Sequence, residues 1–263
     1  MWDWWHVPGQ YTALRTPAWE YFPRALYERF HRRLVAWGRE VLGCHDVSPP
    51  WLSCYVEGCR QELHADVPHG PFAFVYSLTR WTGRAFRGGE TMMLRDEVLS
   101  LWSGGGARGH EYDQLVRLVE PKFGRLVVFD GRVPHGVREV RGTHDPRAGR
   151  LVVHGWFVQP RPFVHGPVRA DVVQARIDDL VGALGGWIAD VPLTGMLSVR
   201  ASVAPDGRVR DARVLADTTR VSPEHERSRR RAIAAIVAAV RGWRLPRARA
   251  ASRVTLPLVF ERG

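Results

Sequence analysis

Short apolar or alternating stretches, separated by glycine and proline, fill the middle of this 263-residue sequence. Seven of them occur within about 110 residues: WLSCYVEG, QELHADV, FAFVYSLT, ETMML, RLVVFD, GVREV and RLVVHGWFV. Runs of this length bounded by turn residues are typical of β-strands, and a close succession of them is typical of all-β folds rather than βαβ units. We therefore expect a β-barrel or β-sandwich over about residues 49–160.

The segment before these stretches has helical periodicity. Apolar residues recur at helical spacing from Ala18 to Leu42, which predicts one long amphipathic helix or two helices broken near Pro23. A helical lead-in of about residues 1–48 would then support the barrel. The proline-rich stretch over residues 158–169 predicts a boundary, so the first domain is expected to span residues 1–167.

Residues 168–263 have the pattern of a small α+β domain. A helix is expected over about residues 171–184, followed by two alternating runs around the turn Pro205-Asp206-Gly207. Ser222 is a plausible N-cap of a second helix, and a last strand is expected from Arg253 to Phe260. The expected order of the accessory domain is therefore ββαβ.

The chain is strongly basic, with a formal net charge of +11. A basic chain first suggests nucleic acid as a partner. Only Lys122 is a lysine among the 38 basic residues, however. Such a bias towards arginine indicates a GC-rich coding sequence rather than selection for phosphate contacts. We therefore regard nucleic acid as an unlikely partner.

The lengths of the apolar runs and the spacing of the cysteines indicate the cellular compartment. The longest apolar run, residues 232–240, is too short to span a bilayer, and the start MWDWWHVPGQ has no signal-peptide pattern. Cys44, Cys54 and Cys59 form no CxxC pair, so neither a disulfide framework nor a zinc knuckle is indicated. We expect a cytoplasmic protein without a membrane partner.

His64 and Asp66 are the first candidates for chemistry. They lie two residues apart in a strand-like stretch, where alternate side chains point to the same face. His135 follows the run RLVVFDGRV, which is expected to return beside that stretch. Two histidines and one carboxylate form the facial set that binds iron(II) and leaves other coordination positions open.

The sequence around these residues resembles the prolyl-4-hydroxylase-like branch of the Fe(II)/2-oxoglutarate-dependent dioxygenases, over about residues 50–160. The matching segments, in the order of that family, are YVEGCRQELHAD, FVYSLT, FRGGETMML, PKFGRLVVFDGRVPHGVREV and RLVVHGWF. The resemblance implies a double-stranded β-helix, or jelly roll, and a dioxygenase that hydroxylates its substrate.

The resemblance also implies site roles. His64, Asp66 and His135 would be the metal ligands and catalytic residues, and Arg150 would bind the distal carboxylate of 2-oxoglutarate. The cofactors implied are Fe(II), 2-oxoglutarate and O2, with ascorbate as a reductant. A guanidinium suits this task because it is a permanent, forked donor to a carboxylate.

Two departures from the family affect the 2-oxoglutarate site. The basic residue follows the distal histidine at a greater distance than usual, so Arg141 and Arg147 are weaker alternatives to Arg150. Gln61 stands where the family commonly has a tyrosine. Further candidate residues for this site are Gln61 itself, Tyr55, Tyr76 and His154.

Residues 195–261 resemble, more weakly, a TonB C-terminal domain, on the PDGRV hairpin, a helix, a WRLP turn and the last run VTLPLVF. We interpret this module as one that docks substrate or mediates self-association.

The expected activity is hydroxylation of an aliphatic C–H bond in a peptide or protein side chain, with release of succinate and CO2. One alternative is the same chemistry on a free amino acid or small metabolite. A second alternative is a non-catalytic jelly-roll protein that binds or senses its ligand.

Overall fold

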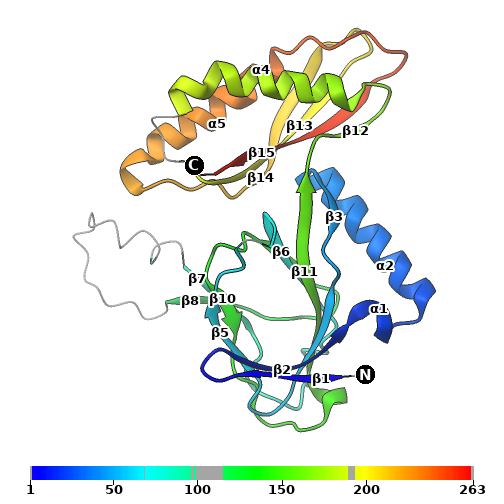
Figure 1. Ribbon diagram of the computed structural model, residues 1–263, viewed down its shortest axis with the longest axis vertical. Coiled ribbons are helices and arrows are strands. Elements are labelled where there is room, and N and C mark those ends of the chain that lie inside the picture. The colour runs from blue at the N-terminus through cyan, green and yellow to red at the C-terminus, as the bar shows by residue number, and fades with distance from the viewer. Residues whose placement is uncertain (1, 68, 96–97, 99–114, 189–192, 262–263) are drawn as a thin grey trace. The chain divides into compact units, whose positions relative to one another are not determined.

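The structure is a computed structural model that describes residues 2–67, 69–95, 98, 115–188 and 193–261 (Figure 1). Contacts between residues divide the chain into two compact units, Met1–Arg32 with Val47–Val158, and Arg33–Asp46 with Gln159–Gly263. Each unit contains one β-sheet. The division into independent domains 1–167 and 168–263 stays a prediction.

The strands of the first unit pair as nested antiparallel partners. These pairs are β4 (Trp51–Tyr55) with β11 (Arg150–Pro160), β5 (Arg60–His64) with β10 (His135–Val137), β6 (Phe72–Ser77) with β9 (Leu126–Phe129), and β7 (Thr91–Leu94) with β8 (Val116–Val119). Further pairing joins them into two arrays, β8-β7-β10-β5 and β4-β11-β6-β9. A long hairpin folded in this way is a jelly roll, so the expected fold class is confirmed.

A β-hairpin lies at the start of the chain, where the sequence indicated only a helical lead-in. It consists of β1 (Asp3–Val7) and β2 (Tyr11–Pro17). The turn between them contains Gly9, whose φ of 72° lies in the left-handed region. Tryptophan, tyrosine, valine and threonine favour strands, which explains the pairing of this segment. β2 lies between β4 and β5 and thereby joins the two arrays.

Helices follow the hairpin as the periodicity predicted. They are α1 (Ala18–Tyr21), α2 (Arg24–Trp37) and a π-helical turn (Gly38–Leu42). The interruption between α1 and α2 contains Pro23. Proline lacks the amide proton that a continuous helix would require there, so the helix is broken at this point. β3 (Cys44–Val47) comes next.

The second unit has a four-stranded sheet in the order β12-β15-β13-β14. Its elements are β12 (Phe163–His165), α4 (Ala170–Ile188), β13 (Gly195–Val203), β14 (Val209–Asp217), a 3-10 turn (Pro223–His225), α5 (Glu226–Arg241) and β15 (Ser252–Phe260). Gly207, with φ 83°, lies in the predicted turn between β13 and β14. The expected ββαβ order and the expected helix before it are confirmed, and β12 is added.

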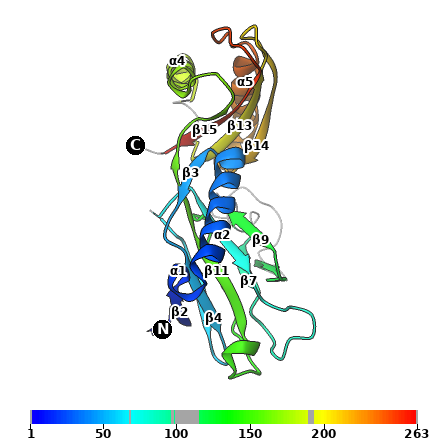
Figure 2. The same ribbon diagram turned by 90° about the vertical axis from the view of Figure 1, so that its right-hand side faces the viewer.

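Both faces of this sheet are covered within the second unit. Figures 1 and 2 show α4 and α5 on one side, where one apolar cluster joins Val173 and Ile177 of α4 to Ile236 of α5 and to the strands. On the other side, the Ser198 hydroxyl donates to the Leu42 carbonyl at 2.8 Å, and the Thr255 hydroxyl donates to the Glu40 carbonyl at 2.7 Å. Residues 33–46 thus pack as part of the second unit.

Within the described residues, no helix is long and apolar enough to cross a membrane. This agrees with the short apolar runs of the sequence.

Candidate functional site: a His-Asp-His cluster above a buried arginine

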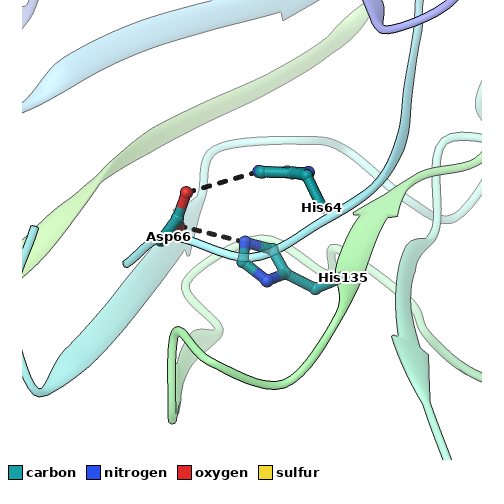
Figure 3. A group of neighbouring side chains, drawn as sticks. All are labelled: His64, Asp66 and His135. Atoms are coloured by element: carbon teal, nitrogen blue, oxygen red, sulfur yellow. Dashed lines mark hydrogen bonds and ion pairs between the residues drawn. The ribbon is translucent and has the colours of Figure 1, made fainter. Parts of the chain in front are cut away.

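His64, Asp66 and His135 converge on one point in the first unit (Figure 3). One ligand atom from each lies within 4.8 Å of the other two. His64 Nε2 is 3.4 Å from Asp66 Oδ1, and His135 Nε2 is 3.1 Å from Asp66 Oδ2. The cluster therefore presents two imidazole nitrogens and one carboxylate to a single position.

Strand pairing places the two histidines. β5 ends at His64 and β10 begins at His135, and these two residues are directly paired in the antiparallel register. Directly paired residues project to the same side of a sheet, so the two rings lie together. Their centroids are 4.4 Å apart.

Asp66 lies just beyond β5, so the strand alternation assumed from the sequence does not place it. Its backbone N–H instead donates to the Gly131 carbonyl at 2.8 Å, in the loop that leads to His135. A Cβ at position 131 would lie 3.2 Å from the Asp66 Cβ, so glycine permits this close approach. The His69 N–H donates to the Asp66 carbonyl at 3.0 Å and closes the turn.

Backbone carbonyls fix the orientation of both imidazoles. His64 Nδ1 lies 3.0 Å from the Glu62 carbonyl, and His135 Nδ1 lies 2.9 Å from the Val133 carbonyl. A carbonyl can only accept, so Nδ1 carries a proton in each ring, and Nε2 faces Asp66, where it donates when the ring is protonated and offers its lone pair to a metal when the ring is neutral. Metal-binding histidines are oriented in this way. The donor set fits an iron(II) ion.

The carboxylate is held in its charged form. Burial alone would raise the pKa of Asp66, but hydrogen bonds from His135 and His64 outweigh it and hold the pKa well below its usual range. The Trp156 indole N–H adds a further hydrogen bond to Oδ2, at 3.0 Å. Burial likewise lowers the pKa of His64, yet the hydrogen bond to Asp66 makes the net shift upward. Asp66 is therefore ionised at neutral pH, as a metal ligand would have to be.

A cavity of about 240 Å³ connects this cluster with the interior of the first unit. Besides the three clustered residues, its lining includes Tyr55, Gln61, Thr91, Arg150, His154 and Trp156.

Arg150 is the most unusual side chain of this cavity, because it is a cation with only 1% of its surface exposed. Nη2 donates to the Thr91 hydroxyl at 3.2 Å, and the guanidinium lies 4.7 Å from the centroid of the Tyr55 ring. Nε and Nη1 are buried and have no hydrogen-bond partner among the described residues. Burial lowers the pKa of this guanidinium. Such a group is costly to bury alone and fits a carboxylate ligand.

The sequence-predicted residues for 2-oxoglutarate fall into two groups. Tyr55, Gln61 and His154 line the cavity with Arg150. Tyr76 does not line it, and its ring packs 5.1 Å from the Phe30 centroid. Strand alternation explains this position, since Tyr76 pairs with Val153, whereas the neighbours of Val153 on β11 face the cavity. Arg147 lies in the exposed 3-10 turn Pro146–Ala148, paired with Asp145.

Three residues of the site were not singled out from the sequence. Thr91 contacts Arg150, Trp156 contacts Asp66, and Arg15 comes from the unexpected hairpin. Thr91 and Trp156 lie in two of the matched segments, so their place in those segments was an available signal. Nothing in the sequence pointed to Arg15, because its position depends on β2 entering the sheet.

Comparisons with known proteins concern the same part of the chain. Residues 50–158 match the 2OG-Fe(II) oxygenase superfamily. A prolyl-4-hydroxylase from Pseudomonas putida is 21% identical, covering 59% of this chain and 77% of its own, with a TM-score of 0.39. A 2OG-Fe(II) oxygenase family oxidoreductase from Burkholderia pseudomallei is also 21% identical, covering 41% and 43%, with a TM-score of 0.28. No curated protein matches the chain.

The matched segment contains the whole His-Asp-His cluster and Arg150. Residues 50–158 thus carry a 2OG-Fe(II) oxygenase domain, which supports the dioxygenase expected from the motifs. The cofactors of this domain are Fe(II), 2-oxoglutarate and O2. The TonB-like resemblance of the second unit stays a prediction.

Proposed function

We propose that the chain hydroxylates an aliphatic C–H bond in a peptide or protein side chain, converting 2-oxoglutarate to succinate and CO2. One observation carries the proposal: a three-residue cluster shares a cavity with a buried guanidinium, two of whose nitrogens lack an acceptor in the part of the chain that the structure describes. Bound iron(II) and 2-oxoglutarate supply the oxidising chemistry, in which O2 is reduced. The protein supplies binding, orientation and exclusion of water.

Each residue of the cluster has a distinct part in this proposal. His64, Asp66 and His135 hold the iron from one side and leave the other side free for the cosubstrate and O2. Hydrogen bonds to backbone carbonyls keep both rings from turning, and Trp156 restrains the carboxylate. These contacts need no rearrangement when the metal enters, which favours tight binding.

Arg150 takes the distal carboxylate of 2-oxoglutarate. Its free Nε and Nη1 lie where a carboxylate could accept from them, and Thr91 can share that anion through its hydroxyl. Tyr55 stacks on the guanidinium and fills the space beside it. His154 is neutral, because burial lowers its pKa well below the ordinary value, and its Nε2 lies 2.8 Å from the Ser53 hydroxyl. We infer that it shapes the cavity without adding charge.

Exposure of the cluster supports a substrate that approaches from the surface. The His64 side chain is 33% exposed, whereas those of His135 and Arg150 are almost covered. A reachable metal site suits one side chain of a larger molecule, which need not enter the protein as a whole.

The proposed cofactor site is tested without knowing the substrate. Adding Fe(II) and 2-oxoglutarate to the full chain under anaerobic conditions should give a weak visible absorption band. Asp66→Ala should abolish it, and Glu28→Gln, an exposed carboxylate on α2, should leave it intact. No band in the wild-type chain, together with no 2-oxoglutarate-dependent succinate in air, would contradict the proposal.

Substrate class is tested by what stimulates succinate formation. Blocked peptides should stimulate it, and free amino acids should not. The reverse result would favour a small-molecule oxygenase. Binding of 2-oxoglutarate without turnover by any of these would favour a binding protein.

We further propose that the second unit docks substrate or mediates self-association in the cytoplasm, with ascorbate maintaining the reduced metal. Sedimentation of the full chain across a concentration series checks self-association directly. A monomer at all concentrations would leave substrate docking as its role.

A further inference from the structure

Arg15 is a second arginine in the cavity of the His-Asp-His cluster. It lies on β2, outside the segment that matches the oxygenase superfamily, and it is directly paired with Ser53 of β4. Ser53 in turn pairs with Val152 of β11, which lines the cavity. Because paired residues project to the same side, the register turns the Arg15 side chain inward. The side chain accordingly lines the same cavity as Arg150.

Aromatic rings hold this side chain in place. The Arg15 guanidinium carbon lies 4.9 Å from the centroid of Trp5 and 5.8 Å from those of Tyr11 and Trp51. Such contacts restrain the cation, but they provide no hydrogen-bond acceptor. Arg15 Nε is buried and has no hydrogen-bond partner among the described residues. The group is therefore oriented in advance for an anion that the described protein residues do not supply.

Arg15 and Arg150 both lower the pKa of the His154 imidazole. His154 has a strongly lowered pKa, caused first by burial and then by the positive charges of Arg15 and Arg150. Arg15 therefore contributes to the electrostatic field inside the cavity. The exposed ion pairs of the surface differ from it, since solvent screens them.

The cofactors leave the charge of Arg15 without a partner. If iron(II) and 2-oxoglutarate bind as proposed, the Asp66 carboxylate and the two carboxylates of 2-oxoglutarate are balanced by the metal and Arg150. The nearby Glu90 does not change this balance, because it lies 3.9 Å from the cation of Arg138. Arg15 as a whole is only partly buried, so an anion that enters the cavity can reach its charge, and its buried Nε still lacks an acceptor among the described residues. The substrate is the component that remains to supply such an anion.

We propose that Arg15 binds a carboxylate of the substrate, so that the preferred substrate is a peptide segment with an acidic side chain or a free C-terminal carboxylate. This inference rests on the proposed function and specifies its substrate class. Arg15 is a specificity-determining residue, since its charge selects which peptide is held beside the metal. The net charge of +11 would assist the approach of such a peptide.

The test measures binding rather than turnover. The full chain is loaded with Mn(II) in place of Fe(II), saturated with 2-oxoglutarate, and used to select from a random hexapeptide library with blocked N-termini. The library is prepared once with free C-terminal carboxylates and once with C-terminal amides. Arg15→Gln, Arg15→Lys and Arg15→Glu are compared with the wild-type chain. Arg84→Gln is the matched control, because Arg84 also stacks on aromatic rings, 3.6 Å from the Trp81 centroid, but lines a different pocket.

The wild-type chain and Arg84→Gln should enrich acidic peptides or, if the C-terminus is recognised, peptides of the free-acid library only. Arg15→Gln should bind the enriched peptides at least about tenfold more weakly, as expected for loss of a charge-assisted contact. Arg15→Lys should keep part of the preference. Arg15→Glu should shift the selection to basic peptides, a change that misfolding cannot produce.

Two results would overturn the inference. One is a wild-type chain that enriches no carboxylate-bearing peptide. The other is an Arg15→Gln variant whose 2-oxoglutarate affinity falls as far as that of Arg150→Gln, which would make Arg15 a cosubstrate residue. Both are distinguishable from failure of the proposed function, in which the wild-type chain forms no succinate from 2-oxoglutarate.

Discussion

The indole N–H of Trp156 donates to Asp66 Oδ2 at 3.0 Å, across 90 residues of sequence. The Trp156 ring is itself stacked on His69, with centroids 4.4 Å apart. The His69 backbone N–H closes the turn on the Asp66 carbonyl, and the His69 ring packs on the Trp156 side chain that bonds the carboxylate. One strand, β11, thus carries Arg150 at its start and the residue that orients Asp66 six positions later.

Trp156→Phe should weaken metal binding by about tenfold to a hundredfold, as is typical when a hydrogen bond to a metal ligand is lost. The phenyl ring retains the stacking with His69 but has no N–H for Asp66. The measurement is the Kd for Mn(II) by titration of the full chain. Trp4→Phe, an exposed tryptophan on β1, is the control. Equal affinities for the two variants would show that the hydrogen bond does not position Asp66.

Arg150→Met should stabilise the chain without ligand and disable its cosubstrate site. Replacing a buried cation that lacks full pairing with an apolar side chain is expected to add about 1–4 kcal/mol to the free energy of unfolding. In the wild-type chain, Mn(II) and 2-oxoglutarate should raise the Tm by mass action, and in the variant 2-oxoglutarate should add nothing. Thermal melting with and without 2-oxoglutarate measures both effects. A lower Tm combined with an unchanged response to 2-oxoglutarate would contradict the assigned role.

Gly43→Ala should destabilise the second unit. Gly43 has φ 77°, and a Cβ there would lie 2.8 Å from Pro257 Cδ of β15. Left-handed conformation costs a residue with a Cβ about 1–2 kcal/mol, and the close contact adds to this. Urea denaturation monitored by circular dichroism measures the loss. Gly9→Ala, at a similar φ but with no atom within 4 Å of its Cβ, is the control and should be less destabilising.

The buried cysteines should be unreactive in the folded chain. Burial raises the pKa of Cys44 and of Cys54 to about 12, so both thiols stay protonated at pH 8, and only the thiolate reacts with iodoacetamide. Cys44 lies in the second unit and Cys54 in the first. Mass-spectrometric rates of alkylation at the two positions should therefore follow the opening of each unit. Rapid alkylation without denaturant would show that a site is open in the folded chain.

The strand stretches of residues 51–158 predicted much of the first unit because glycine and proline bound each one. The hairpin of residues 3–17 was missed since its aromatic residues precede a helical pattern and have no repeated turn signal. Tertiary pairing with β4 and β5 decides its structure.

In the site, too, local sequence patterns indicate some residues, and tertiary structure places the others. His64, Asp66, His135 and Arg150 could be named from spacing and motif, and the structure brings all four to one cavity. Alternation along the strand cannot explain the position of Asp66, because β5 ends before it and the loop at Gly131 holds it. Arg15 could not be found from sequence, since its side chain reaches the cavity only through the register between β2 and β4.

If the proposed function is right, this cavity couples the reduction of O2 to the decarboxylation of 2-oxoglutarate at the His-Asp-His cluster. The most direct test is to supply dioxygen labelled with heavy oxygen to the full chain with Fe(II) and 2-oxoglutarate, and to analyse the succinate by mass spectrometry. The wild-type chain should form succinate carrying one labelled oxygen atom, and Asp66→Ala should form none. Unlabelled succinate, or equal labelling with the two chains, would contradict the proposed function.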